Sequence, residues 1–459
     1  MPKPAVTADI KVVIGEFPPF WDKSVIFFAN LQSIFFGNQE QTDQLVEELK
    51  GVPTYGGRLV PLLDLIFKKK QNLIFLEALP DKALLEYLGN RLGLSLPGIE
   101  VLPDDYYDSV KKQILAGNQD AAKEMLSVLR EHPAKWMDGF VTGRVLARLA
   151  AVSGKQTISS FDGSRDGNNK YLLYCFLKEE GLPVFDTVPA DTPDDAIAGL
   201  EELKKMGYQK AVIKSQIGAS GYGMMLCDTD ADGGAELPEF LFYNKPCLVQ
   251  GWIDETVAGI KRIGSPSVQM FLSDDELYLF DITEQFLKDD SVHEGNISPP
   301  PYLSGRPDIK EQLLVQAAKA GRWLYSQGYR GTASIDYLVV EKDGVLTVHI
   351  CEINARVTGA TYPAVLARHF VPDGSWLMRN IRFHTSFEGA DLLAKLEEYG
   401  LLFDRQKTKG ILPFNFNLDA DNKVDKGQFI FIGSDPAECM GLMEQVQSNF
   451  KEAYSFARD

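Results

Sequence analysis

Acidic, amide and guanidinium side chains alternate where one strand-like run of the chain ends. In the stretch HICEINARVTGATYP, residues 349–363, Glu352, Asn354 and Arg356 follow one another at intervals of two. Side chains two apart in a strand point to the same face, so all three would share one face. The small residues that follow, Thr-Gly-Ala-Thr, leave room for another molecule to approach.

A neighbouring strand-like run brings a further acid toward this face. Residues 334–340, SIDYLVV, contain Asp336 and connect to the first run through Lys342-Asp-Gly344, as in a β-hairpin. A three-residue loop with a left-handed glycine places Asp336 opposite Ile350 and diagonal to Glu352, on the same face. A two-residue loop would instead put the two carboxylates on opposite faces.

In the three-residue register, this face suits magnesium and phosphate. Mg²⁺ prefers oxygen ligands, here from Asp336, Glu352 and Asn354, with phosphate oxygens in the remaining positions. An arginine such as Arg356 suits a phosphate or an oxyanion. A polar strand end that faces water would have the same composition, and the hairpin alone leaves that alternative open.

A lysine at the end of another predicted strand precedes a glycine-rich segment. In KAVIKSQIGASGYG, residues 210–223, Lys214 is followed by three glycines and two serines. Backbone N–H groups of such a segment can surround phosphate oxygens while the lysine neutralises their charge. The segment lacks the Gly-Lys-Ser/Thr of a Walker A loop. A simple turn is the alternative interpretation.

Three other segments carry candidate functional residues. Lys170 opens a predicted helix after two asparagines, although a lysine there opposes the helix dipole; a bound anion or plain solvation would explain it. The segment LVQGWID, residues 248–254, leaves a buried strand through polar residues, as a hinge does. His293 is a candidate base or metal ligand, or else a solvated loop residue.

The predicted elements that must position these residues change in character along the chain. Before a boundary near residue 155, strands alternate with helices, which favours a parallel sheet; they are predicted at Ile10–Ile14, Leu73–Leu76, Asp81–Leu92 and Gly143–Ala151. From there to about 385 the pattern is mixed, with helices at Lys170–Glu180, Pro193–Lys205 and Asp308–Tyr325, and strands at Ala211–Lys214, around Leu248, and at Ser267–Leu272 and Glu276–Phe280. After 386, helices at Leu392–Tyr399 and Pro436–Phe450 flank one or two strands, which predicts a small α+β unit.

Composition limits the classes of function. The chain has 459 residues, 45% of them hydrophobic, and a net charge of −17, which opposes binding to nucleic acid. Five widely spaced cysteines without a CxxC pair favour a reducing compartment. Because no apolar run approaches the length of a membrane span and no signal peptide is evident, we expect a cytoplasmic protein without a membrane or nucleic-acid partner.

Taken together and in order, the motifs resemble the ATP-grasp superfamily. The resemblance rests on Lys170 with Gly181-Leu-Pro-Val184, Lys214 with the glycines that follow it, the hinge-like strand around Leu248, and Asp336 with Glu352-x-Asn354. It implies a pre-ATP-grasp α/β domain at 1–155, a two-lobed ATP-grasp domain at 156–385 with a lid lobe at about 170–255, and a small C-terminal α+β domain at 386–459. The whole layout is most similar to the pheganomycin-type peptide ligases.

The resemblance also implies ATP, one or two Mg²⁺ ions and a role for each motif. Asp336, Glu352 and Asn354 would bind the metal, and Arg356 and Lys214 would act in catalysis, with Arg356 stabilising the transferring phosphoryl group or an oxyanion. The nucleotide would be bound by Lys170, Lys214, Ser220, Gly221, Gly223, Gln250, Trp252, Asp254 and Asn296. Where the family often has a glutamate in the hinge this chain has Gln250, and the ribose-binding acid is open between Asp254 and Glu255.

The implied activity is that of a carboxylate–amine ligase. ATP would phosphorylate a small-molecule carboxylic acid, and an amine, from an amino acid or peptide, would attack the acyl phosphate to give an amide, ADP and phosphate. Phosphotransfer without ligation is one alternative. A non-catalytic nucleotide-binding scaffold is another, which the presence of Lys214, Asp336, Glu352 and Asn354 disfavours. A homodimer is left open.

Overall fold

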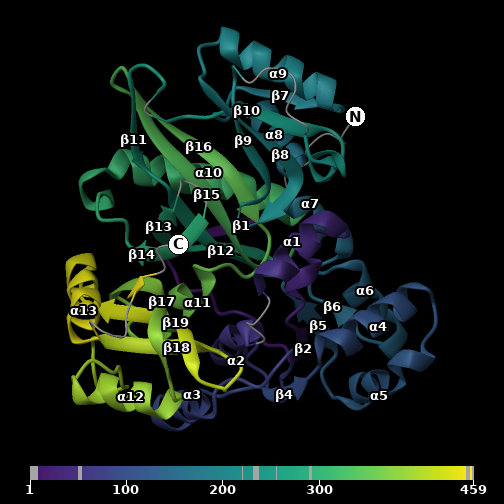
Figure 1. Cartoon of the computed structure of the whole chain (residues 1–459), viewed down its shortest axis with the longest axis vertical. Helices are drawn as coiled ribbons and strands as arrows, with labels where there is room; N and C mark the ends of the chain where they lie inside the picture. The colour runs from purple at the N-terminus through teal and green to yellow at the C-terminus, as the bar shows by residue number, and fades with distance from the viewer. Residues whose placement is uncertain are drawn as a thin grey trace.

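Three β-sheets organise the chain in the computed structural model (Figure 1). The structure describes residues 9–49, 54–219, 221–230, 237–254, 256–288, 292–450 and 455–456. The sheets have five, four and eleven strands, and the large one connects segments from all parts of the chain.

The N-terminal sheet is parallel, as the sequence predicts. Its strand order is β4-β3-β2-β5-β6, and all its pairs are parallel. The central strands VIFF and LIFL are buried along their whole length, because helices cover both faces of the sheet. The strands are β2 (Val25–Phe28), β3 (Leu73–Leu76), β4 (Gly98–Val101), β5 (Trp136–Gly139) and β6 (Gln156–Thr157).

Two groups of helices pack on this sheet. On one face lie α4 (Asp104–Leu115), α5 (Lys123–Glu131) and α6 (Arg144–Ser153), which ends in the left-handed Gly154. On the other lie the short helix η2 (Tyr55–Leu59), α2 (Val60–Ile66) and α3 (Lys82–Glu86). The Asp81 carboxylate accepts from the N–H of Leu84 and begins α3, which continues as a π-helical turn to Arg91. The remaining helix of this part, α1 (Gln39–Leu49), faces the lid described below.

The first predicted strand belongs elsewhere. β1 (Lys11–Ile14) pairs in parallel with β13 (Glu276–Lys288) of the large sheet, and not with any strand of the N-terminal sheet. The expectation that Ile10–Ile14 is part of the N-terminal parallel sheet is therefore wrong. A short apolar run specifies a strand but not its partner, which is chosen by long-range packing.

The large sheet has the order β11-β15-β12-β13-β14-β17-β19-β18, with β16 added on β15, β1 on β13 and β20 on β17. Helix α10 (Pro307–Ser326) packs on its first half, and α11 (Thr361–Phe370) lies near its middle (Figure 1). Its other strands are β11 (Ile260–Gly264), β12 (Pro266–Leu272), β14 (Val292–Ser298), β15 (Gly331–Lys342), β16 (Val345–Asn354), β17 (Ser375–Phe387), β18 (Gly410–Leu418), β19 (Val424–Gly433) and β20 (Ser455–Phe456).

The C-terminal segment continues this sheet. β17 pairs with β14 on one side and with β19 on the other, and it runs across residue 385. Two helices complete the segment, α12 (Gly389–Glu398) and α13 (Pro436–Asn449), and both lie close to the predicted positions. The division into domains at 155 and 385 stays a prediction, although β1 and β17 show that the large sheet extends past both positions.

A four-stranded antiparallel sheet forms a separate lobe at the top of Figure 1. Its order is β7-β10-β8-β9, and α9 (Pro193–Lys205), begun by a capping box at Thr192, packs against it. The expected glycine-rich loop is the tip of the β8–β9 hairpin, since strand pairing continues to Ala219 and resumes at Tyr222. The strands are β7 (Thr187–Ala190), β8 (Lys210–Ala219), β9 (Tyr222–Asp228) and β10 (Cys247–Gly251). We call this hairpin the lid hairpin.

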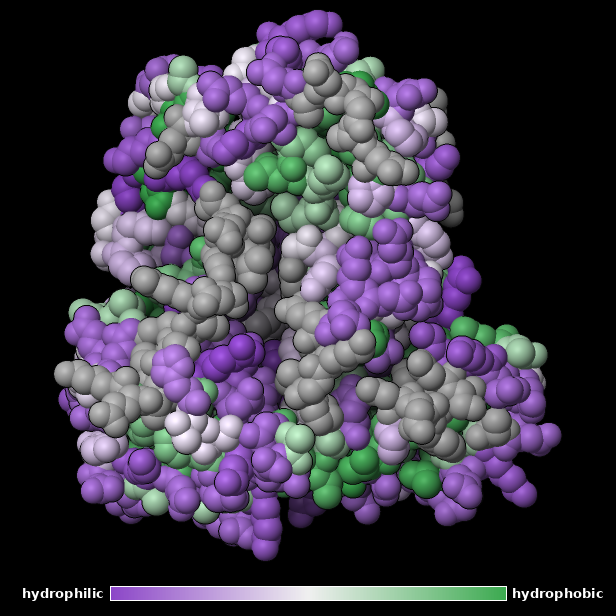
Figure 2. Space-filling view, viewed as in Figure 1, coloured by the Kyte–Doolittle hydropathy of each residue, from purple (hydrophilic) through white to green (hydrophobic). Residues whose placement is uncertain are grey.

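The coloured part of the face seen in Figure 2 is largely hydrophilic. Figure 2 shows hydrophilic residues over most of the visible face, with apolar residues in scattered groups. In the part of the chain that the structure describes, no helix combines the length and apolarity needed to cross a membrane.

Candidate active site

A cavity of about 530 Å³ is lined by residues of the four-stranded and eleven-stranded sheets and by loop and helix residues of the N-terminal part. It contains most of the residues that the sequence singles out: Lys170, Lys214, Gly221, Gly223, Gln250, Trp252, Asn296, Asp336, Glu352, Asn354 and Arg356. Asp254 is not among its lining residues, and the predicted residues Ser220 and Glu255 lie outside the described part of the chain. Segments separated by almost two hundred positions thus meet in one site.

The hairpin that carries the acids has a two-residue turn. Lys342 pairs with Val345, and Asp343 and Gly344 between them have φ of 51° and 80°. Positive φ at both central residues is the geometry of a type I′ turn, for which Asp-Gly is favoured. Of the two loop lengths that the sequence leaves open, the two-residue loop is therefore the one that forms.

A β-bulge nevertheless brings the two acids together. The two-residue register continues to Tyr337 opposite Ile350, and there it shifts by one residue. Cys351 is the extra residue, so Asp336 pairs directly with Glu352. Residues directly opposite in a ladder share a face, so the predicted convergence of the carboxylates is found, but through a bulge instead of a longer turn.

Burial and nearby charges affect the two acids in opposite ways. Burial raises the pKa of Asp336 to about 7, and the neighbouring carboxylate of Glu352 adds to the effect. Burial also acts to raise the pKa of Glu352, but Lys170, whose Nζ lies 2.8 Å from Oε2, with Arg356 and Lys214, outweighs it and lowers the pKa. Of the two carboxylates, Glu352 therefore receives more stabilisation from nearby positive charge than Asp336, which has Arg356 alone among the causes of its shift.

Three consecutive residues where α8 (Lys170–Glu179) begins, namely Asn168, Asn169 and Lys170, make different contacts. The Asn169 side chain accepts from the N–H groups of Tyr171 and Leu172 and so caps the helix. The cap orients Lys170 toward Glu352. Asn168 accepts from the N–H of Ala355 at 3.1 Å and from the guanidinium of Arg356. The sequence analysis noted these asparagines but assigned them no role.

Asn354 connects the acids to the arginine. Its Nδ2 donates to Asp336 Oδ2 at 2.8 Å and, more weakly, to Glu352 Oε1 at 3.4 Å, while its Oδ1 accepts from Arg356. To act as a metal ligand, the amide would have to turn its oxygen toward the carboxylates. No group of three His, Cys, Asp or Glu side chains in the described residues could hold a metal ion, so two carboxylates and this amide are the protein ligands on offer here. Oxygen donors of this kind suit Mg²⁺.

The other lysine lies at the lid. Lys214 is buried, which lowers its pKa, and its Nζ donates to Gln250 Oε1 at 2.8 Å. Gln250 in turn donates to Thr187 at 3.1 Å, so strands β8, β10 and β7 are cross-linked by side chains. Asp254 instead receives a hydrogen bond from Lys210 at 3.3 Å, away from the cavity lining.

His293 and Asn296 lie on strand β14, not in a loop. The imidazole is hydrogen-bonded to Asn296 Oδ1 and contacts Gly359, where a Cβ would lie 2.8 Å from His293 Cε1. Burial lowers the pKa of His293, which keeps it neutral near pH 7. The solvated-loop interpretation of His293 is therefore wrong.

Several residues that line the cavity are not among the candidate functional residues predicted from the sequence. Residues 357–360 line the cavity directly before α11, a helix that was not predicted. Other lining residues come from the N-terminal part (Tyr55 and Arg58) and from the C-terminal strands (Asn380, Arg382, Asn417, Asp425, Lys426 and Gln428). None of these follows a spacing pattern, so only the folded structure brings them to the site.

Comparisons with known proteins agree with this geometry. No family model matches the chain. A [butirosin acyl-carrier protein]–L-glutamate ligase of Niallia circulans is 26% identical over 342 residues, which cover 71% of each chain. Similar solved structures include biotin carboxylase from Campylobacter jejuni (TM-score 0.57, 12% identity, 94% of this chain and 92% of that one) and an N5-carboxyaminoimidazole synthase from Aspergillus clavatus with ADP (0.54, 13%, 94% and 100%). An L-amino acid ligase from Bacillus licheniformis is a further example (0.50, 13%, 93% and 97%).

The sheet arrangement and these similarities show that the chain shares the fold of the biotin carboxylase and N5-carboxyaminoimidazole synthase structures, and the predicted fold is confirmed. The curated relative is named as a ligase, which agrees with the predicted activity of an ATP-dependent carboxylate–amine ligase. The narrower resemblance to pheganomycin-type peptide ligases stays a prediction.

Proposed function

We propose that this enzyme activates an amino-acid or peptide carboxylate as an acyl phosphate and joins it to an amine. The observation that carries the proposal is the convergence of Lys170, Lys214, Asp336, Glu352 and Arg356 on one cavity. Such a set can neutralise a phosphate chain at one end and a reacting carboxylate at the other.

The lysines and the lid hairpin would bind the phosphates of ATP. Lys170 and Lys214 both line the cavity, and Gly221 and Gly223 at the hairpin tip have φ of 85° and 84°, which exposes their backbone to a ligand. Closure of the hairpin would also exclude water, which an acyl phosphate requires. Trp252 and Gln250 would form the wall beside the base, and Asn296 would lie toward the reacting end.

Asp336, Glu352 and Asn354 would hold Mg²⁺ once the amide of Asn354 has turned. A bound Mg²⁺ supplies positive charge that offsets the burial and repulsion at Asp336 and the charge of the phosphates. Lys170 would then exchange its ion pair with Glu352 for a phosphate oxygen, a short movement for a flexible side chain.

Arg356 and the start of α11 would stabilise the developing negative charge on the substrate. Arg356 is fixed by Asn168 and Asn354, so its guanidinium is oriented before the substrate arrives. Gly359 and Ala360 line the same cavity, and their N–H groups donate to no other described residue. They lie at a helix N-terminus, where an oxyanion is favoured.

The kind of substrate follows from the relatives and is part of the proposal. One relative is named for L-glutamate and another for L-amino acids. An amino acid or short peptide as the acid, and an amino acid or related amine as the acceptor, is therefore the starting choice. The predicted cytoplasmic location and homodimer stay predictions.

The test is ADP release from ATP and Mg²⁺ against a panel of amino acids and dipeptides, with and without a second amine. Hydroxylamine, which converts acyl phosphates into hydroxamates, replaces the amine in a parallel series. We expect hydroxamate from at least one acid, and its loss in Arg356→Ala with the fold intact by circular dichroism. ADP release that needs no amine and gives no hydroxamate would indicate phosphotransfer without ligation; no ADP release at all would indicate a scaffold.

A further inference from the structure

Arg58 is a buried cation in the cavity that the proposed reaction does not use. It is only 7% exposed and lines the cavity from the N-terminal part of the chain. Its Nε donates to the carbonyl of Tyr55 at 3.0 Å, and its guanidinium lies 3.5 Å from the centre of the Tyr55 ring. Within the described residues, no carboxylate forms an ion pair with it.

A buried guanidinium without a counter-ion is unfavourable, because it loses water and gains no opposite charge. The ring of Tyr55 returns only part of that loss. The free-energy cost of burying such a group is small if a ligand supplies the missing negative charge. The cavity, which is open to small molecules, is where that ligand would come from.

The backbone around Arg58 is held tightly, so the position of the side chain is specified. A Cβ on Gly56 would lie 2.9 Å from Ala29 and Leu76, and one on Gly57 would lie 2.7 Å from Asn415. Thr54, four residues before Arg58, accepts a hydrogen bond from the N–H of Leu418 at 3.2 Å and so connects this segment to β18.

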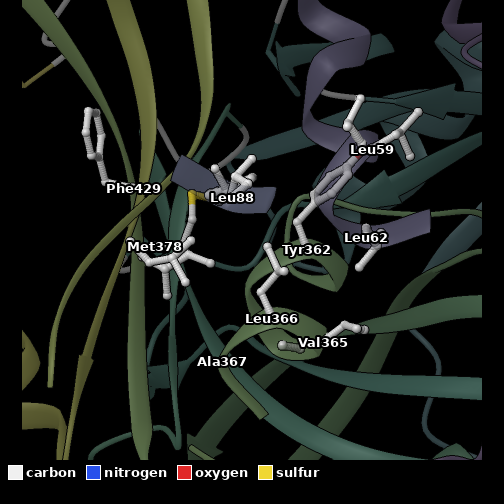
Figure 3. Close-up of a cluster of buried hydrophobic side chains, with 14 of the residues drawn as sticks. Leu59, Leu62, Leu88, Tyr362, Val365, Leu366, Ala367, Met378 and Phe429 are labelled. Atoms are coloured by element: carbon white, nitrogen blue, oxygen red, sulfur yellow. The ribbon is translucent and has the colours of Figure 1, made fainter. Parts of the chain in front are cut away.

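The apolar residues that follow Arg58 fix it relative to the reacting end. In Figure 3, the ring of Tyr362, from the first turn of α11, points toward the segment that carries Leu59, and Leu62 lies in the same buried cluster. The guanidinium of Arg58 is 5.7 Å from the centre of the Tyr362 ring. Arg58 is thus held beside the helix whose N-terminus lines the cavity.

We propose that Arg58 binds a substrate carboxylate other than the one that is phosphorylated; this rests on the proposed ligase function. The planar fork of arginine can donate two parallel hydrogen bonds to a carboxylate. A single buried cation balances a monoanion, whereas a phosphate would need further positive charge. The carboxylate comes either from a second acidic group of the acid substrate or from the amine substrate.

The experiment compares probes that differ only in that carboxylate. L-Glutamate and L-glutamine test the acid side, and L-alanine and L-alaninamide test the amine side. Binding of each is measured by calorimetry with a non-hydrolysable ATP analogue and Mg²⁺ present, and turnover by ADP release. The proteins are wild type, Arg58→Gln, Arg58→Lys and Arg144→Gln. Arg144 is the matched control because it also stacks on an aromatic ring, at 5.7 Å, but is exposed and outside the cavity lining.

We expect wild type to prefer the carboxylate over the amide in one of the two pairs. Arg58→Gln should weaken binding of that carboxylate about 10- to 100-fold, the size of a lost charged hydrogen-bond pair, and leave the amide unaffected. Arg58→Lys should keep part of the preference, and Arg144→Gln all of it. The pair in which the effect occurs identifies the source of the carboxylate.

Three results would overturn the proposal. One is wild-type binding without a preference for either carboxylate; another is an equal loss for carboxylate and amide in Arg58→Gln, which indicates a structural role; the third is no change. Because binding is measured without turnover, these results are separate from a failure of the ligase function, which would appear as the absence of ADP and hydroxamate.

Discussion

Replacing Asn168 by alanine tests whether the reaction depends on where Arg356 is held. Asn168 is buried, and each of its polar atoms has two partners. Oδ1 accepts from Ala355 N and from the Arg356 guanidinium, while Nδ2 donates to Ser164 O at 2.7 Å and to Ala355 O at 3.2 Å. The side chain therefore joins helix α7 (Phe161–Gly167) to the end of β16.

The magnitude follows from the groups that lose a partner. Removing Oδ1 leaves a buried N–H and one side of a guanidinium unpaired, at about 1–3 kcal/mol each, so we expect the free energy of unfolding to fall by roughly 2–6 kcal/mol. The part that concerns Arg356 is one charged hydrogen bond. Its loss lets the guanidinium leave the reacting position, and we expect kcat to fall about 10- to 100-fold.

Asn72→Ala is the matched control. Asn72 is equally buried, accepts from Val25 N at 2.9 Å and donates to Phe67 O at 2.7 Å, but it lies directly before β3 of the N-terminal sheet, outside the cavity lining. Both variants should show a lowered unfolding midpoint, and only Asn168→Ala should lose kcat in the ADP-release assay. If Asn168→Ala keeps kcat within about twofold of wild type, the orientation of Arg356 by Asn168 does not contribute to the rate.

Further predictions concern the metal site, the reacting end, the lid and pH. Glu352→Gln should reduce ADP release at least about 100-fold while circular dichroism shows that the fold is retained. The reason is that the substitution removes the negative charge that pairs with Lys170 and would bind Mg²⁺. Near-normal turnover would contradict the proposed role of Glu352. Gly359→Ala should lower kcat about 10-fold, since its Cβ would meet His293 at 2.8 Å, and His293→Ala in the same chain should restore part of it. Gln41→Ala removes two hydrogen bonds to the lid hairpin, so the KM for ATP should rise about 2- to 10-fold; an unchanged KM would show that this contact does not hold the lid. Burial lowers the pKa of His349 from 6.5 to about 4, so the unfolded chain binds the proton more readily and stability falls as the pH drops through this window; His349→Phe should make the fall in unfolding midpoint shallower, and an unchanged slope would contradict it.

The elements that the sequence predicts well are those with strong local signals. Pro193–Lys205 is a helix at the predicted residues because a threonine cap and an acidic first turn begin it and lysines end it. Leu73–Leu76 is a strand at the predicted residues because a continuous apolar run suits a sheet covered on both faces. In both cases the information lies within the segment itself.

The hairpin that carries Asp336 and Glu352 shows where local signals are no longer sufficient. Asp343-Gly344 is a strong two-residue turn signal, and the structure has that turn. With that turn alone, the two acids would lie on opposite faces. The bulge at Cys351 returns the two acids to the same face, and the residue type at that position does not predict a bulge. The prediction of convergence was correct although its register was wrong.

The residues that the sequence analysis missed were brought into the site by tertiary packing. Asn168 contacts Ala355 and Arg356, almost two hundred residues later in the chain, and Arg58 reaches the cavity because its neighbours pack on α11 and β18. Neither belongs to a spacing pattern. The function of a buried polar side chain can be recognised only when its neighbours in the folded structure are known.

The position of the C-terminal strands argues that they are part of the catalytic unit. β17 pairs with β14, which carries His293 and Asn296, and with β19, which carries Gln428. The cavity wall therefore passes without interruption from the strand nearest the reacting end to the C-terminal strands, and Gln428 donates to Asn380 across that pairing at 2.9 Å. Removing the strands would expose the edge of β17 and open the cavity to water, which would hydrolyse the acyl phosphate before an amine could attack. A chain cut near residue 385 should therefore lose coupling between ADP release and amide formation sooner than it loses nucleotide binding.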